Sequence, residues 1–110
     1  WTRDLAASVG VAAPLHACEH YYVLFEGVEG IDNSLPVLRD YDYCGYYKYD
    51  AGKLLVGAFE PNARPWGMDG ISEDFCFDEI AGSFEHFEPL LIDAMRRVPA
   101  LEKAGIQKFF

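Results

Sequence analysis

The chain has 110 residues, enough for one domain with a modest core, and its 51% hydrophobic and 15% aromatic content favours a folded chain over a disordered one. Acidic residues outnumber basic residues by 18 to 9, and the resulting net charge of −9 argues against nucleic-acid binding. The three cysteines Cys18, Cys44 and Cys76 are widely spaced, which is typical of unpaired thiols in a reducing compartment. No apolar run reaches the ~18 residues of a membrane span, so we expect no membrane contact.

The first quarter of the chain reads as a helix followed by a long strand. Residues 1–9 predict the end of a helix that stops at Gly10, a residue suited to a left-handed cap. Residues 15–26 predict the longest strand, with His20 on one face and Val23 on the other. Because neither face is fully polar, we expect this strand to lie in the middle of its sheet.

Shorter strands and a hairpin follow. Residues 36–40 predict a short strand, and residues 45–50 with 53–60 predict a hairpin. We expect a three-residue connection, Asp50-Ala51-Gly52, with the glycine in the left-handed region. Residues 61–70 contain two prolines and two glycines, which predicts an irregular segment.

The period of the hydrophobic pattern changes to that of a helix after Ser83, a suitable N-cap. Pro89 is expected to kink this helix or to restart it, and a short helix is expected from Pro99 to Gly105. The residues at helical spacing are Phe84, Phe87, Leu91, Ala94, Met95 and Val98. Together these patterns predict an α+β fold, in which one main helix covers an antiparallel sheet.

His20 is the most informative candidate for chemistry, because an imidazole can accept or share a proton near neutral pH. Tyr46, in the first strand of the hairpin, can donate its hydroxyl hydrogen to a substrate carboxylate. The alternatives are a core histidine with a backbone or carboxylate partner, and a tyrosine that only packs. A shared pocket requires that the two side chains lie on one side of the sheet, with their tips within roughly 10 Å, a span that one small ligand bridges.

Two further residues are weaker candidates for the wall of a substrate pocket. Lys48 shares a strand face with Tyr46, although an exposed lysine in water is the simpler interpretation. Trp66, in the irregular segment, offers an aromatic face that suits a methylated ammonium group, although interior packing is the simpler interpretation.

Metal and dinucleotide sites are not expected in this chain. His16, Cys18 and His20 alternate on one strand face, but residues i to i+4 span about 13 Å along a strand, too far to share one ion. A dinucleotide-binding unit needs the pattern G-x-G-x-x-G after a strand, and the ten glycines do not form it.

Motifs along the whole chain carry a resemblance to one family. They are PLHACEHYYV (14–23), LPVLRD (35–40), GYYKY (45–49), GAFE (57–60), PW (65–66), HFEPLL (86–91) and RVPALE (97–102). These segments resemble the substrate-binding domain of flavin-dependent sarcosine and dimethylglycine dehydrogenases, which are flavoproteins of the D-amino-acid-oxidase type. The resemblance implies that residues 1–110 are one partial domain, with the FAD-binding and C-terminal folate-type domains outside it.

The resemblance also implies a function for the parent protein, the oxidative N-demethylation of sarcosine or dimethylglycine with FAD. Tetrahydrofolate is implied only for a parent with the folate-type domain. In the resembling enzymes, a histidine and a tyrosine at the positions of His20 and Tyr46 are implicated in substrate binding. The implied partners are a small methylated amine and the rest of the parent chain, and the implied location is the cytoplasm, or the mitochondrial matrix in a eukaryote. By itself, the fragment is expected to be inactive.

A non-catalytic alternative rests on one of the same motifs. The stretch PLHACEH (14–20), followed by an aromatic residue, also resembles the regulatory subunit of pyruvate dehydrogenase phosphatase. An intact glycine fingerprint in the parent protein would favour the enzyme, and a degraded one would favour the regulatory or binding subunit.

Overall fold

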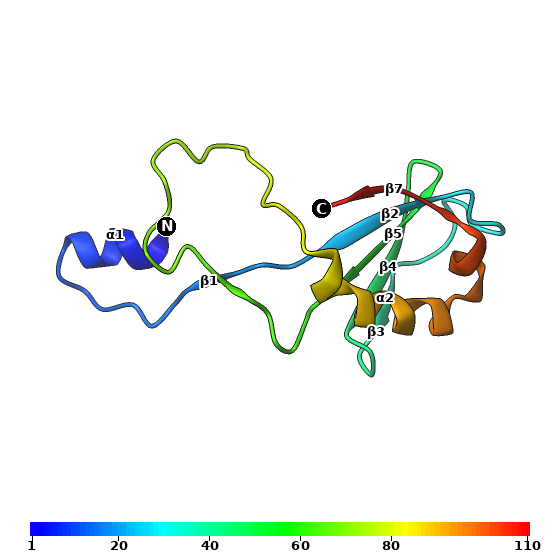
Figure 1. Cartoon of the computed structure of the whole chain (residues 1–110), viewed down its shortest axis with the longest axis horizontal. Coiled ribbons are helices and arrows are strands. Elements are labelled where there is room, and N and C mark those ends of the chain that lie inside the picture. Colours follow the sequence, from blue (N-terminus) through cyan, green and yellow to red (C-terminus); the bar gives the residue numbers. More distant parts are fainter.

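Five antiparallel strands form the main sheet, in the order β3-β4-β5-β2-β7, in a computed structural model that describes residues 1–110 (Figure 1). Strand β2 is interior to the sheet, as expected, and β3 and β7 lie at its edges. The strands are β2 (Tyr22–Glu26), β3 (Leu38–Asp40), β4 (Gly45–Asp50), β5 (Lys53–Ala58) and β7 (Gly105–Phe109).

Helix α2 (Phe84–Arg97) covers one face of this sheet and continues into the short 3-10 helix η1 (Pro99–Lys103). The side chain of Ser83 accepts a hydrogen bond from the backbone N–H of His86 at 3.3 Å, which confirms the expected N-cap. Pro89 does not restart the helix, which runs through it without a break. The α+β architecture with one main covering helix is therefore confirmed.

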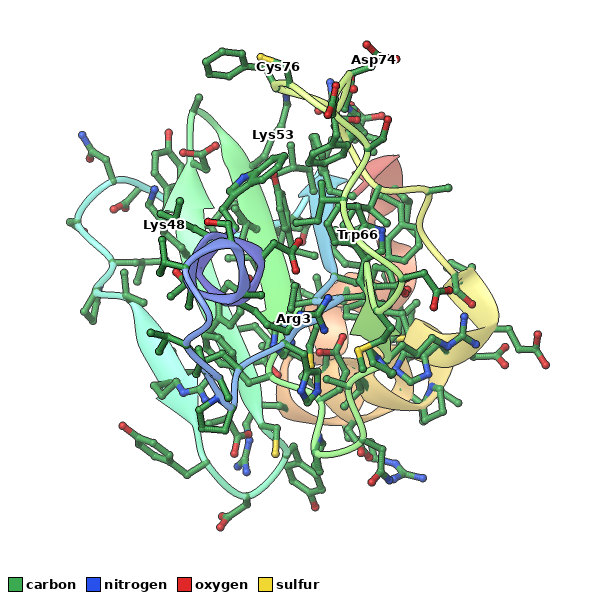
Figure 2. All side chains as sticks on the ribbon, turned by 90° about the vertical axis from the view of Figure 1, so that its left-hand side faces the viewer. Arg3, Lys48, Lys53, Trp66, Asp74 and Cys76 are labelled. Atoms are coloured by element: carbon green, nitrogen blue, oxygen red, sulfur yellow. The ribbon has the colours of Figure 1, made fainter.

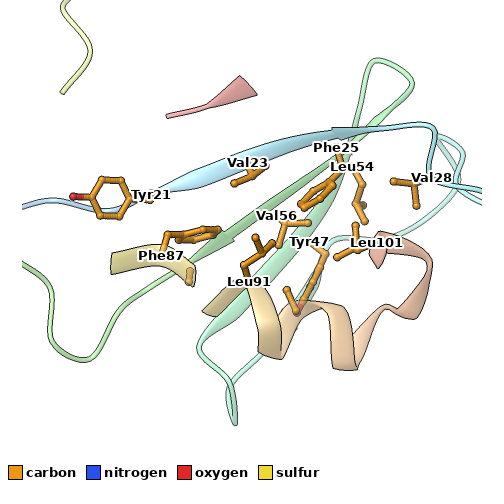
Figure 3. Packing of buried hydrophobic residues seen from close by; sticks show 12 residues of the cluster. Tyr21, Val23, Phe25, Val28, Tyr47, Leu54, Val56, Phe87, Leu91 and Leu101 are labelled. Carbon is orange, nitrogen blue, oxygen red and sulfur yellow. The ribbon is translucent and has the colours of Figure 1, made fainter. Parts of the chain in front are cut away.

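The core lies between α2 and the sheet (Figure 3). Alternate residues of the strands point toward the helix, and the least exposed side chains come from both layers. These fully buried side chains are Phe25, Phe87, Leu101, Val23 and Val56.

A polar contact joins strand β3 to the end of helix α2. Nε of Arg97 donates to Oδ2 of buried Asp40 at 2.6 Å, and Oδ1 of Asp40 accepts from the backbone N–H groups of Asp42 and Tyr43. Burial alone would raise the pKa of Asp40, but the hydrogen bonds from Arg97 and from these backbone groups outweigh it and lower the pKa.

An arm extends from the sheet and lengthens the molecule to 53 × 28 × 28 Å. It contains helix α1 (Thr2–Ser8) and the two-residue strands β1 (Ala17–Cys18) and β6 (Pro65–Trp66), which pair with each other. Figure 2 views the molecule from the arm, with α1 seen end-on. The guanidinium of Arg3 donates to the carbonyl oxygens of Gly67 and Met68, at 2.8 and 3.2 Å, and so ties α1 to the loop after β6.

The expectations for the strands were wrong in several details. The predicted strand 15–26 is two strands, because the backbone N–H of Tyr21 bonds to the Glu60 side chain instead of a neighbouring strand. The hairpin has a two-residue turn, with positive φ at both Ala51 and Gly52, and its second strand ends at Ala58. The segment 61–70 is irregular apart from β6, and β7 was not predicted at all.

Candidate functional site

The face of the sheet opposite α2 carries a row of polar and aromatic side chains. Arg39 pairs with Tyr46, Tyr46 pairs with Gly57, and Gly57 pairs with Tyr22, so these positions form one line across four neighbouring strands. Tyr47 and Val56, their neighbours in sequence, point to the opposite side and belong to the core. The row therefore lies on the face that α2 leaves uncovered.

Three polar side chains contact the ring of Phe59, which lies just after β5. They are those of His20, Tyr46 and Arg39. The ring centroids of His20 and Tyr46 lie 5.6 and 5.3 Å from that of Phe59, and Cζ of Arg39 lies 4.2 Å above the ring. We call His20, Arg39, Tyr46, Phe59 and Glu60 the Phe59 cluster. The structure thus brings His20 and Tyr46 to one ring, and their shared pocket and their role in substrate binding stay predictions.

Glu60 is the closest partner of His20. Its Oε2 lies 2.6 Å from Nδ1 of His20, and its Oε1 accepts from the backbone N–H of Tyr21 at 3.3 Å. The side chain of Glu60 is 3% exposed, whereas that of His20 is 42% exposed. The pair therefore has a buried carboxylate behind an imidazole that reaches the surface.

Tyr46 owes its position to a glycine. Its ring lies over Gly57, where an added Cβ would come within 2.1 Å of the ring. Burial raises the pKa of Tyr46, nearby Tyr22 and Glu60 raise it further, and Arg39 partly opposes them. The hydroxyl is thus protonated at neutral pH and available as a hydrogen-bond donor.

A cavity of about 400 Å³ lies beside His20. Aromatic rings and carboxylates share its wall, a combination that suits a cationic amine. Its lining includes Tyr22, Phe75, Phe110, Glu19, Asp78 and Glu79. One of these carboxylates, that of Glu79, already pairs with Lys108 at 2.8 Å.

A second cavity, of about 280 Å³, lies in the arm against α1. It is lined by Arg3 and His16, among others, and contains no residue of the Phe59 cluster. We base the candidate site on the cavity beside His20, because the imidazole of His20 belongs to the Phe59 cluster and also lines this cavity.

The two weaker candidates lie outside the Phe59 cluster. Lys48 is 53% exposed and pairs with Asp50 at 3.5 Å. Trp66 lies in the arm, and its ring packs 4.9 Å from that of Phe75, which lines the cavity beside His20. Trp66 therefore contacts one wall residue of this cavity and does not line the cavity itself.

Several features of the wider chain complete the description. The structure contains no group of three or more His, Cys, Asp or Glu side chains that could hold a metal ion. Cys18, Cys44 and Cys76 are free thiols. No helix has the length and apolar character to cross a membrane.

Sequence reasoning did not single out Arg39, Phe59 or Glu60 as site residues. Phe59 and Glu60 end a motif that was noted only for its resemblance, and Glu60 is 40 residues from His20 in the chain. The available signal was a glutamate two residues after a strand of mostly buried residues, a position that does not by itself predict a partner.

Known proteins resemble the chain over nearly its full length, although no family model matches. It is 45% identical to 4-methylaminobutanoate oxidase (formaldehyde-forming) of Paenarthrobacter nicotinovorans, over 99% of the chain and 13% of that protein. It is 36% identical to mitochondrial sarcosine dehydrogenase of Homo sapiens, over 97% of the chain and 11% of the enzyme. It is also 34% identical to the mitochondrial pyruvate dehydrogenase phosphatase regulatory subunit of Mus musculus, over 98% of the chain and 12% of that protein.

The chain thus spans only about an eighth of the length of these relatives. The resemblance expected from the motifs is confirmed, because the similarity extends to mitochondrial dimethylglycine dehydrogenase as well. The chain belongs, as a segment, to the oxidoreductase family that contains 4-methylaminobutanoate oxidase and the sarcosine and dimethylglycine dehydrogenases.

Proposed function

We propose that the chain is the substrate-side segment of a flavin-dependent oxidoreductase that oxidatively N-demethylates sarcosine or dimethylglycine. The observation that carries this proposal is the Phe59 cluster, in which His20 and Tyr46 meet at one ring on the uncovered face of the sheet. The names of the relatives add support, because three of them act on an N-methylated amino acid.

The cluster can handle both ends of such a substrate. The amine must lose its proton before it is oxidised, and His20 is the group that can accept this proton at the surface of the cluster. The neutral hydroxyl of Tyr46 can donate a hydrogen bond to the substrate carboxylate. The aromatic and acidic wall of the adjacent cavity suits a methylated ammonium group.

The residues of this chain do not form a dinucleotide-binding unit. A dinucleotide-binding unit is built on parallel strands and a glycine-rich turn, whereas every strand pair here is antiparallel and the glycine pattern is absent. The proposal therefore assigns most of the FAD site, and tetrahydrofolate where the parent protein uses it, to parts outside this segment. The segment itself binds and orients the amine.

A second candidate function is non-catalytic. The 34% identity to the pyruvate dehydrogenase phosphatase regulatory subunit favours it, since a homologue can keep this fold as a regulatory or binding subunit. For either function we place the parent protein in the cytoplasm, or in the mitochondrial matrix if it is eukaryotic, as the names of the mammalian relatives suggest.

The test uses the full-length protein that contains this segment. We would record its flavin absorbance without oxygen during addition of sarcosine, dimethylglycine and 4-methylaminobutanoate, and then measure formaldehyde. Bleaching by sarcosine or dimethylglycine supports the proposal and ranks the two substrates. Bleaching by 4-methylaminobutanoate alone corrects the substrate, bound flavin that none of them reduces refutes the proposed activity, and a protein without flavin favours the regulatory subunit.

A further inference from the structure

We propose that Glu60 is a positioning residue that holds His20 with its proton on Nδ1, so that Nε2 is the atom that accepts the proton of the substrate amine. This inference rests on the proposed function for its chemistry and on the geometry of the pair for its structure. Nδ1 of His20 lies 2.6 Å from the buried carboxylate, and Nε2 has no hydrogen-bond partner in the structure.

The tautomer follows from the chemistry of the partner. An ionised carboxylate only accepts hydrogen bonds, so the ring nitrogen that faces it must be the one that carries hydrogen. Nε2 of the neutral ring is then a lone-pair acceptor. When it takes the proton of a methylammonium group, the amine becomes neutral and the imidazolium that forms stays paired with Glu60.

Glu60 is itself held in place by its surroundings. Its second oxygen accepts the backbone N–H of Tyr21 at 3.3 Å, and its side chain is almost fully buried. The edge-to-face contact of Phe59 with the His20 ring, at an interplanar angle of 69°, adds a second constraint on the imidazole. Carboxylate and ring together fix which nitrogen of His20 points outward.

The test is a ¹⁵N NMR measurement of the histidine side chains in this chain, which needs neither flavin nor turnover. We expect His20 to be predominantly the Nδ1–H tautomer at a pH where it is neutral. Glu60→Gln should reduce that fraction, because a glutamine amide can also donate a hydrogen to Nδ1. Glu102→Gln, at an exposed position, is the matched control and should leave His20 unchanged.

A predominantly Nε2–H imidazole in the unmodified chain would overturn the proposal, as would a tautomer ratio that Glu60→Gln does not alter. In the full-length protein, Glu60→Gln should lower kcat/KM by roughly 100-fold, the usual order for lost acid–base assistance. Glu60→Asp, which keeps a carboxylate, should recover part of the loss. If the parent oxidises no amine, the proposed function fails, and the NMR result still decides the role of Glu60.

A separate observation concerns Arg39, and we infer that it anchors the carboxylate of the substrate. Arg39 is half-buried and forms no ion pair, although the chain is strongly acidic. Its Nη1 has only long contacts with the carbonyl oxygens of Cys44 and Gly45, at 3.4 and 3.5 Å. Most of its donors are therefore free for a ligand.

The position of Arg39 matches this role. It pairs with Tyr46 in the sheet register, and its guanidinium lies over the same Phe59 ring that His20 touches. A planar guanidinium can hold a carboxylate with two parallel hydrogen bonds. An amino acid bound at Phe59 would thus have its amine at His20 and its carboxylate at Arg39 and Tyr46.

The test compares an acid with its neutral amide. In the full-length protein, Arg39→Gln should raise KM for sarcosine by roughly 10- to 100-fold, the order of a hydrogen bond to a charged group, with a smaller change for sarcosine amide. Arg96→Gln, at an exposed position, is the matched control. Equal effects on acid and amide would overturn the inference.

The same comparison is available by NMR titration of this chain with sarcosine and sarcosine amide. The acid should shift the side-chain Nε resonance of Arg39, and the amide should not. This measurement decides the role of Arg39 even if the parent protein oxidises neither compound, and an unshifted Arg39 at saturating sarcosine would also overturn the inference.

Discussion

Substitution of Gly57 by alanine tests how the Phe59 cluster is built. An added Cβ would come within 2.1 Å of Cζ and 2.2 Å of Oη of Tyr46, so the tyrosine ring must leave its place over the strand. It would then lose its contact with Phe59, 5.3 Å away between centroids. Overpacking of this kind typically costs about 1–3 kcal/mol. We therefore expect Gly57→Ala to lower the free energy of unfolding by that amount.

The effect should depend on Tyr46 and on no other tyrosine. With Tyr46→Ala as the background the obstacle is absent, and Gly57→Ala should become neutral or stabilise the chain by roughly 0.5–1 kcal/mol, since glycine is unfavourable within a strand. A double-mutant cycle from urea unfolding, followed by circular dichroism, measures the difference. Tyr49→Ala is the control, because this residue lies on the same strand but points to the other face.

The reasoning fails if Gly57→Ala costs the same in both backgrounds, or if it is neutral in the unmodified chain. Either result would mean that the tyrosine ring moves aside without loss, and that its place beside Phe59 is not fixed by the glycine. A thermal measurement serves as a check, since each kcal/mol shifts Tm by about 4–8 °C in a domain near this size.

The remaining predictions concern the core, the carboxylate of Asp40 that pairs with Arg97, and the isolated chain. Phe87→Ala should cost about 3–5 kcal/mol in urea unfolding, because the ring is 1% exposed, and exposed Phe84→Ala, the control, should cost much less. Asp40→Asn should lower Tm at neutral pH. The lowered pKa of Asp40 stabilises the fold above the ordinary value of 3.8, and this gain is lost as the pH falls through the folded value. The difference in Tm between the unmodified chain and Asp40→Asn should therefore become smaller in acid. A difference that does not change with pH would contradict this role of Asp40. The purified chain should be colourless and show no amine oxidation, and stoichiometric flavin in it would contradict the proposed division of roles.

Local sequence patterns predicted most of the secondary structure. The helix after Ser83 has a strong periodic signal and a capping side chain, both of which act over a few residues, and it forms as expected. The hairpin around Gly52 was also predicted from a local signal, in this case the turn residues between its two strands. Strand β7 was missed because its five residues are mostly exposed at the sheet edge, where burial imposes no alternation.

The candidate site was predicted only in part. His20 and Tyr46 were identified because their residue types suggest chemistry and because their motifs resemble those of known enzymes. Their partners Arg39 and Glu60 come from other segments of the chain, and no pattern in the sequence joins them.

The sequence by itself determined the α+β class, the covering helix and the family, because these depend on short-range periodicity and on residue identity. The tertiary structure decided which face of the sheet stays open and which side chains meet on it. Glu60 contacts His20, which lies 40 residues away in the chain. The ring of Phe59 contacts Arg39, His20 and Tyr46, which come from three different segments. Such contacts depend on strand order and register, which form only when the strands pair and α2 buries the opposite face.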